Sequence, residues 1–139
     1  MTEESPAPEP LLGGIKVLCV DDSDDYREIV MVMLRVHGAT VFGARGHDEA
    51  LEILQRERPD VLLSDIGMPG NGRNLLSRVR ALPPDAGGQT PAAAVTAFTS
   101  PDDQKSALAA GFQVHIPKPV EPTQLAMAVA TLAGRRPAS

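Results

Sequence analysis

The clearest indication of the fold lies at residues 15–23, which read Ile-Lys-Val-Leu-Cys-Val-Asp-Asp-Ser. The apolar run Ile15–Val20 is typical of a short buried strand, and two acids follow the run directly. A helix is predicted next, over Ser23–His37, because capping residues begin this stretch and Gly38 ends it. A strand followed at once by a helix is the repeating unit of an α/β protein.

One stretch of this predicted helix allows a second interpretation. Residues 29–34 are apolar at every position, so they show no single helical stripe, and a strand is conceivable there. The length of the segment, with Asp22 or Ser23 as the N-cap, favours the helix. As a helix, the stretch either buries all its apolar side chains in the core or leaves some exposed for a protein partner.

The same alternation of strand and helix continues to the end of the chain. Its repeats predict a parallel sheet with helices on both faces and right-handed crossovers. Further strands are expected at Ala39–Ala44, Val61–Ser64, Ala92–Thr96 and Phe112–Ile116, and further helices at His47–Glu57, Asn74–Ala81, Ser100–Gly111 and Glu121–Gly134.

Length and composition indicate one domain. The 139 residues are 42% hydrophobic and 22% charged, which is typical of a globular protein. We expect a leader or linker without a packed structure over residues 1–13, one domain over 14–134 and a flexible tail over 135–139. The single cysteine, Cys19, excludes an internal disulfide and a cysteine-built metal site, and we expect it to be buried.

The charge and hydropathy of the chain exclude several classes of partner. A net charge of −5 argues against nucleic acid as the main partner, because a nucleic-acid binder needs a basic surface. No apolar run approaches the ~20 residues that span a bilayer, so we expect no membrane insertion. The acidic, proline-rich start of the chain lacks the pattern of a signal peptide, and a cytoplasmic protein is the simplest interpretation.

Charged and hydroxyl side chains stand where the predicted strands end. Asp21 and Asp22 follow the first strand, Asp65 the third, Thr96 closes the fourth, and Lys118 follows the fifth. Because the carboxyl ends of parallel strands meet at one end of a sheet, these groups should share a site. Crowded carboxylates repel one another unless a cation joins them, and Mg²⁺ prefers such oxygen ligands. Beside that ion, Asp65 could attack a phosphoryl group, with Lys118 and Thr96 stabilising the developing charge.

Four motifs carry a resemblance to a known family, the receiver domain of bacterial two-component response regulators. They are Val-Leu-Cys-Val-Asp-Asp (17–22), Leu-Leu-Ser-Asp-Ile-Gly-Met-Pro-Gly (62–70), Val-Thr-Ala-Phe (95–98) and Ile-Pro-Lys-Pro (116–119). The resemblance covers residues 14–134. It implies a flavodoxin-like doubly wound sheet of five parallel strands in the order 2-1-3-4-5.

The resemblance also implies a role for individual residues. Asp65 would accept a phosphoryl group from a phosphohistidine of a sensor histidine kinase or a histidine phosphotransfer protein. Asp22 and Asp65 would bind Mg²⁺ directly, and Asp21 would bind it through water. The backbone carbonyl of Gly67 would be the third protein ligand of the metal, and Gly67 would also belong to the phosphate-binding residues.

The remaining implied roles concern the last two strands. Thr96 and the Ala97 amide would contact the phosphoryl group, and Lys118 would pair with it. The Lys118–Pro119 bond resembles the cis peptide of the family. Thr96 and the residue three positions before the lysine would form the switch. The family often has an aromatic residue there, whereas this chain has His115, for which an ordinary surface position on an edge strand is the alternative.

The sequence is compatible with several functions. The chain ends after the last predicted helix, so we expect the signal to pass to a protein target, with no enzyme activity beyond its own phosphorylation and dephosphorylation. It could instead be the detached C-terminal receiver of a hybrid histidine kinase, acting as a phosphate relay or sink. An aspartyl-nucleophile phosphatase is less favoured, because the position of its second acid is Gly67, and a pseudo-receiver would lack an acid or the lysine. The loop 70–73 departs from the usual Gly-Met-Asp-Gly.

Overall fold

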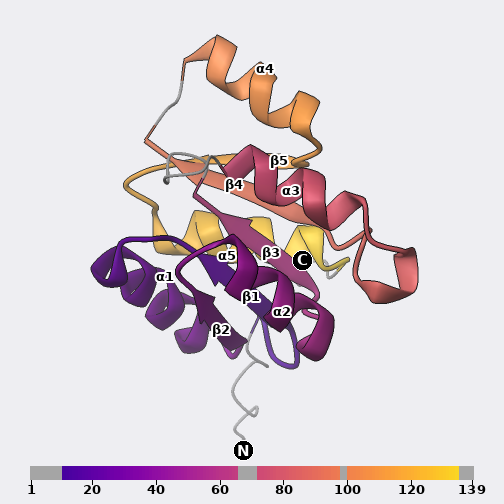
Figure 1. Cartoon of the computed structure of the whole chain (residues 1–139). Helices are drawn as coiled ribbons and strands as arrows, with labels where there is room; N and C mark the ends of the chain where they lie inside the picture. Colours follow the sequence, from indigo (N-terminus) through magenta and orange to yellow (C-terminus); the bar gives the residue numbers. More distant parts are fainter. Residues whose placement is uncertain (1–10, 66–71, 98–99, 135–139) are drawn as a thin grey trace, which may run out of the picture.

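The computed structural model describes residues 11–65, 72–97 and 100–134, with the side chains of 72–74 left out (Figure 1). Within these ranges five strands alternate with five α-helices. The strands are β1 (Lys16–Val20), β2 (Thr40–Ala44), β3 (Val61–Ser64), β4 (Ala92–Thr96) and β5 (Val114–Pro117). The helices are α1 (Asp24–Val36), α2 (His47–Glu57), α3 (Gly72–Arg80), α4 (Pro101–Ala110) and α5 (Pro122–Leu132), and a 3₁₀ turn spans Pro84–Ala86.

The strands form one parallel sheet in the order β2-β1-β3-β4-β5, which confirms the predicted flavodoxin-like fold. Helices α1 and α5 cover one face of the sheet, and α2, α3 and α4 cover the other (Figure 1). Alternate residues of β1 serve the two faces, because Val17 and Cys19 belong to the α1/α5 core and Leu18 and Val20 to the opposite core. The central strands are therefore apolar at successive positions.

Helix α1 settles the alternative over residues 29–34. Its N-cap is Ser23, whose hydroxyl accepts a hydrogen bond from the Tyr26 amide at 3.2 Å. Val30, Met31 and Leu34 are buried, while the side chains on the opposite side of the helix are exposed (Ile29, Val32 and Val36). The stretch is a helix with an apolar inner face and an apolar outer face.

The fifth strand begins later than predicted. Phe112 lies before β5 and is buried in the core beneath α4, because Gly111 turns the chain with a positive φ of 111° at the end of that helix. Gln113 then anchors the segment to β4, since its side-chain oxygen accepts a hydrogen bond from the Ala92 amide at 2.8 Å. Regular pairing starts at Val114, opposite Ala93.

The expected boundary at residue 14 is wrong for the last residues of the leader. Leu12 is completely buried in the α1/α5 core, and its amide donates to the carbonyl oxygen of His37 at 2.8 Å. The prediction considered the start of the chain as an acidic, proline-rich leader. It therefore overlooked that the apolar residues 11–12 pack against the α1/α5 core. Residues 1–10 and 135–139 lie outside the described residues, so their predicted disorder stays a prediction.

Two further expectations concern cysteine and membranes. Cys19 is buried with its thiol free, as predicted. Among the helices described, none has the length and apolar character to cross a membrane.

Candidate functional site

The register of the sheet brings two of the predicted acids together. Strands β1 and β3 are neighbours although they are not consecutive, and Val20 pairs with Ser64 at their last residues. The next residues, Asp21 and Asp65, therefore emerge side by side at the carboxyl end of the sheet. The Asp65 amide donates to the Val20 carbonyl oxygen at 3.0 Å, which extends the ladder to the site.

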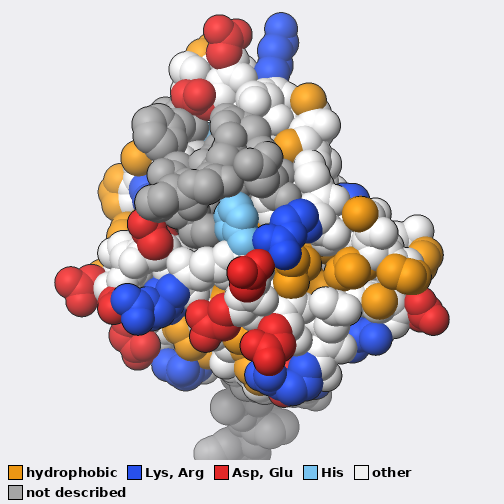
Figure 2. Space-filling view, in the orientation of Figure 1, with side chains coloured by type: hydrophobic (Ala, Val, Ile, Leu, Met, Phe, Trp, Pro, Cys, Tyr) orange, Lys and Arg blue, Asp and Glu red, His pale blue; other side chains and the backbone are white. Residues whose placement is uncertain are grey.

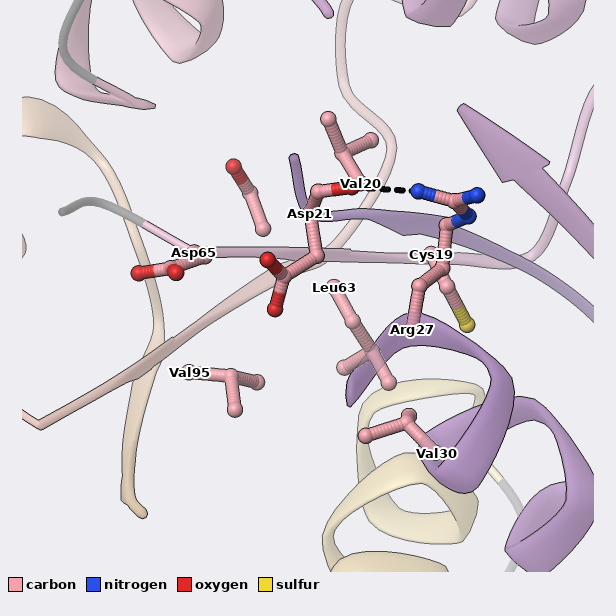
Figure 3. Close-up of a pocket in the computed structure, with 9 residues that line it drawn as sticks. Cys19, Val20, Asp21, Arg27, Val30, Leu63, Asp65 and Val95 are labelled. Atoms are coloured by element: carbon pink, nitrogen blue, oxygen red, sulfur yellow. Dashed lines mark hydrogen bonds between the residues drawn. The ribbon is translucent and has the colours of Figure 1, made fainter. Parts of the chain in front are cut away.

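Three carboxylates meet at this point. Asp21, Asp22 and Asp65 each offer an oxygen within 4.8 Å of the others. Asp21 is buried, Asp65 is half-buried and Asp22 is exposed, so the cluster opens to solvent on one side. In Figure 3 the carboxylates of Asp21 and Asp65 lie next to each other beyond the strand ends. Negative groups this close repel one another unless a cation lies among them.

Lys118 supplies one positive charge to this cluster. Its ammonium lies 3.0 Å from both Asp21 Oδ2 and Asp65 Oδ2, and its side chain is only 16% exposed. Burial acts to lower the pKa of Lys118, but the hydrogen bonds to Asp65 and Asp21 outweigh it, so the pKa lies above its ordinary value. The peptide bond to Pro119 is cis, as the resemblance implied.

The other predicted site residues occupy β4 and β5. Thr96 is buried at the end of β4, and its carbonyl oxygen accepts a hydrogen bond from the Lys118 amide at 2.9 Å. Ala97 follows it and is exposed. His115 pairs with Ala94 and is half-buried on the edge strand, on the same face of the sheet as Thr96. Thr96 and His115 are thus close neighbours on adjacent strands.

Gly67 and the loop at 70–71 lie outside the described residues, so the predicted backbone ligand and the departure in that loop stay predictions. Of the predicted site residues that are described, the register gathers all at the carboxyl end of the sheet, except His115, which lies farther down β5.

Two residues of the site were missed in the sequence. The ring of Tyr26 lies 4.0 Å from the Lys118 ammonium, in the geometry of a cation–π contact. Arg27 donates a hydrogen bond to the backbone carbonyl oxygen of Asp21 at 2.7 Å (Figure 3). This bond connects the backbone at the first of the two adjacent acids to α1. Both residues are in the first turn of the helix that follows the acids, a position that places side chains next to the strand end.

Cys19 lines a small cavity with Asp21, Arg27 and Asp65, but its chemistry is separate from the site. Burial raises the pKa of its thiol to about 12, so the sulfur stays protonated and poorly nucleophilic at neutral pH. In Figure 3 its sulfur lies on the side of α1, away from the two carboxylates. His47, the first residue of α2, is partly exposed, and burial lowers its pKa.

The donor atoms at the site fit a hard divalent cation. They are carboxylate oxygens from three acids, and one of these, Asp22, is exposed to solvent. Mg²⁺ binds one or two carboxylates and keeps several waters, which a partly open acidic cluster allows.

The view in Figure 2 shows acidic and basic side chains interspersed over the part where α1, β2 and α2 lie, a pattern typical of a solvated surface.

Comparison with known proteins gives a match to one family model. The response regulator receiver domain matches residues 17–130. An uncharacterized 14.6 kDa protein of Leptolyngbya boryana is 42% identical over 82% of this chain and 86% of its own length. The response regulator protein PilR of Pseudomonas aeruginosa is 38% identical over 84% of this chain, and the sensor protein GacS of Pseudomonas syringae pv. syringae is 33% identical over 82%.

Solved structures give the same result. A putative response regulator from Chloroflexus aurantiacus is similar with a TM-score of 0.80 and 31% identity, covering 87% of this chain and 98% of the other. The chemotaxis response regulator CheY4 of Vibrio cholerae is similar with a TM-score of 0.77 and 33% identity, covering 85% and 98%.

The chain spans most of the Leptolyngbya boryana protein but only 25% of PilR and 13% of GacS, so the resemblance to those two is to one part of each. Receiver domains are signalling domains of two-component systems, generally without enzyme activity. They are phosphorylated on an aspartate, bind Mg²⁺ at an acidic pocket, and interact with histidine kinases or phosphotransfer proteins. With this fold, this acidic cluster and a family match over 17–130, the chain belongs to the response regulator receiver domain family.

Proposed function

We propose that this chain is the phosphoacceptor of a two-component phosphorelay and that Asp65 receives the phosphoryl group. The observation that carries the proposal is the Lys118 ammonium, 3.0 Å from both Asp21 and Asp65, with a third carboxylate in the same cluster. This pairing concentrates a fixed positive charge where a transferred phosphoryl group would bring negative charge.

Each site residue has a part in the transfer. Asp21, Asp22 and Asp65, with the Gly67 backbone, would hold Mg²⁺, which when bound neutralises phosphoryl oxygens. An oxygen of Asp65 forms a bond to phosphorus as the phosphorus–nitrogen bond of the donor phosphohistidine breaks, and the released imidazole takes up a proton. Lys118, the Thr96 hydroxyl and the Ala97 amide then pair with the phosphoryl oxygens.

The donor would be a sensor histidine kinase or a histidine phosphotransfer protein, and the chain would catalyse only its own phosphorylation and dephosphorylation. We propose that the output is a change in protein contacts. The phosphoryl group adds about −1.5 to −2 charges at Asp65, to which the Thr96 hydroxyl turns, and His115 moves into the space that Thr96 leaves. The test is a pair of structures with and without beryllofluoride; unmoved Thr96 and His115 would refute this switch.

A second role is favoured by the similarity to GacS, a sensor protein of which this chain matches 13%. The chain would then act as the receiver of a hybrid histidine kinase and pass its phosphoryl group on to a phosphotransfer protein. Transfer of the label from phosphorylated Asp65 to such a protein, measured against simple hydrolysis, separates this role from a switch that acts on a downstream target.

The test of the proposed function is incubation with acetyl phosphate and Mg²⁺, followed by intact mass measurement. Wild type should gain one phosphoryl group, and Asp65→Asn should gain none. Asp60→Asn is the matched control, because Asp60 is the acid just before β3 at its other end, where its carboxylate accepts a hydrogen bond from the Lys16 amide. Chelation of Mg²⁺ should abolish the gain in wild type. Equal labelling of wild type and Asp65→Asn would overturn the proposal.

A further inference from the structure

Tyr26 makes two contacts with the segment that carries Lys118. The face of its ring lies 4.0 Å from the ammonium, and its phenolic oxygen accepts a hydrogen bond from the Val120 amide at 3.0 Å. The side chain is partly buried and packs against the α1/α5 core, so the ring has a fixed support. One side chain of α1 thus holds both the charge of Lys118 and the backbone two residues beyond it.

The ammonium of Lys118 is enclosed by three groups. Asp21 and Asp65 accept hydrogen bonds from it at 3.0 Å each, and the Tyr26 ring lies on a further side. A lysine side chain is a flexible four-carbon stem with a strongly hydrated charge, and nothing in its own structure holds it in one position. When the phosphoryl group arrives, the hydrogen bond to Asp65 must be exchanged for one to phosphoryl oxygen. The ring is the contact that this exchange does not need to break.

We infer that Tyr26 is a positioning residue for phosphoryl transfer. Its ring keeps the Lys118 ammonium directed into the acidic cluster, and its hydroxyl fixes the backbone between β5 and α5 from which Lys118 extends. The inference rests on the proposed role of Asp65. A charge that is already in place before reaction stabilises the transition state without the cost of reorganisation, which is the reason that such positioning matters.

The test compares three variants by their rate of phosphorylation from acetyl phosphate. Tyr26→Leu removes the ring and the hydroxyl, and we expect the rate to fall about tenfold. Tyr26→Phe keeps the ring and loses the bond to Val120, and we expect a fall of about twofold. Phe42→Leu is the matched control, because Phe42 is a half-buried aromatic residue of β2 that packs against the opposite core, and its rate should equal wild type.

A second readout follows the ammonium itself. The chain has three lysines, so a nitrogen-15 lysine label gives a simple ammonium spectrum. In wild type the Lys118 signal should exchange slowly with water and carry a ring-current shift from Tyr26. Tyr26→Phe should keep both properties, and Tyr26→Leu should lose them. Phe42→Leu should leave them unchanged, and a purely structural role of Tyr26 would not single out this signal.

The outcomes separate the two proposals. If wild type gains no phosphoryl group, the proposed function fails, whatever the variants do. If wild type is modified and Tyr26→Leu reacts at the same rate, or keeps the shifted Lys118 signal, the inference about Tyr26 is overturned. Mg²⁺ affinity should stay within about twofold of wild type in Tyr26→Leu, because this substitution leaves all three carboxylates of the cluster in place. If Tyr26→Leu does not fold, an unshifted Lys118 signal in Tyr26→Phe would itself overturn the inference.

Discussion

The two ends of the sheet each carry a lysine beside acids, yet the two groups differ in burial. At the carboxyl end, the Lys118 side chain is 16% exposed and its partners Asp21 and Asp65 are 8% and 13% exposed. At the amino end, Lys16 is 43% exposed and lies 3.9 Å from Glu57, which is 30% exposed. The same kinds of residue therefore form a desolvated charge cluster at one end and a partly exposed pair at the other, where the Lys16 ammonium also donates a hydrogen bond to the Glu57 carbonyl oxygen at 3.0 Å.

The position of these residues in the fold, and not their type alone, therefore creates the site. At the amino end, β1 begins at the partly exposed Lys16, and Leu12 supplies a completely buried contact. At the carboxyl end, the order β2-β1-β3 sends the chain to opposite sides after β1 and β3, which opens the space that the acids occupy. Packing should thus control stability at the amino end, and charge should control both stability and chemistry at the carboxyl end.

The largest expected effect comes from the amino end. Leu12→Ala removes a completely buried side chain from the α1/α5 core, and we expect a loss of about 3 kcal/mol in the free energy of unfolding. Phosphorylation by acetyl phosphate should continue under conditions where the variant is folded. Leu11→Ala, at a partly buried neighbour, is the control and should cost less. Urea denaturation measures both, and equal small losses would show that residue 12 does not belong to the core.

The next effect separates the two lysines. Lys118→Met leaves Asp21 and Asp65 facing each other without the ammonium, and we expect a loss of about 2 kcal/mol in the absence of Mg²⁺. The rate of phosphorylation should fall more than about tenfold. Lys16→Met should change the free energy of unfolding by no more than about 0.5 kcal/mol, because water screens the charges of that partly exposed pair. Similar losses for both variants would show that burial does not make the Lys118 cluster contribute more to stability than the Lys16 pair.

A smaller effect is expected from the metal. If Mg²⁺ binds the folded chain alone, a concentration of ten times its Kd should raise the free energy of unfolding by about 1.4 kcal/mol. Asp22→Asn should remove most of this gain, while Asp25→Asn should retain it, because Asp25 is an exposed acid outside the cluster. Calorimetric titration checks the affinity directly. Equal binding by Asp22→Asn and wild type would remove Asp22 from the site.

The sequence was sufficient to predict the fold and to identify the acids and the lysine of the cluster. The fold follows from the alternation of strands and helices, and the cluster follows from the residues at the strand ends. Asp21, Asp65 and Lys118 each come directly after a strand, and the parallel order brings such residues together. Their contacts, at 3.0 Å, depend on the reach of one long side chain across two strands, which no local pattern contains.

What the sequence did not predict depends on packing between segments far apart in the chain. Tyr26 meets Val120 across a separation of 94 residues, and Leu12 meets His37 through a backbone hydrogen bond that composition cannot indicate. The start of β5 was misplaced because the alternation of Phe112, Val114 and Ile116 is that of a strand, whereas the buried side of Phe112 is set by the turn at Gly111.

The smallest expected effect is a pH dependence of the free energy of unfolding that arises from Lys118. The pKa of Lys118 is raised above 10.5, so its stabilising contribution is complete below that pH and is lost as the pH rises through the higher folded value. The difference in the free energy of unfolding between wild type and Lys118→Met should therefore be constant from neutral pH to about 9 and should shrink above about 10.5.

Cys19 also weakens the fold at high pH, because its pKa rises from 9.0 to about 12 on folding and the unfolded thiol ionises first. Wild type and Lys118→Met both contain Cys19, so its contribution cancels in the difference between them and the contribution of Lys118 remains. Urea denaturation of the two proteins at matched pH values measures that contribution, with Lys16→Met as the control at a partly exposed lysine. A difference that stays constant through the alkaline range would mean that folding does not raise the pKa of Lys118 above that of a lysine in water. The contrast between the two ends of the sheet would then be one of geometry without an electrostatic consequence.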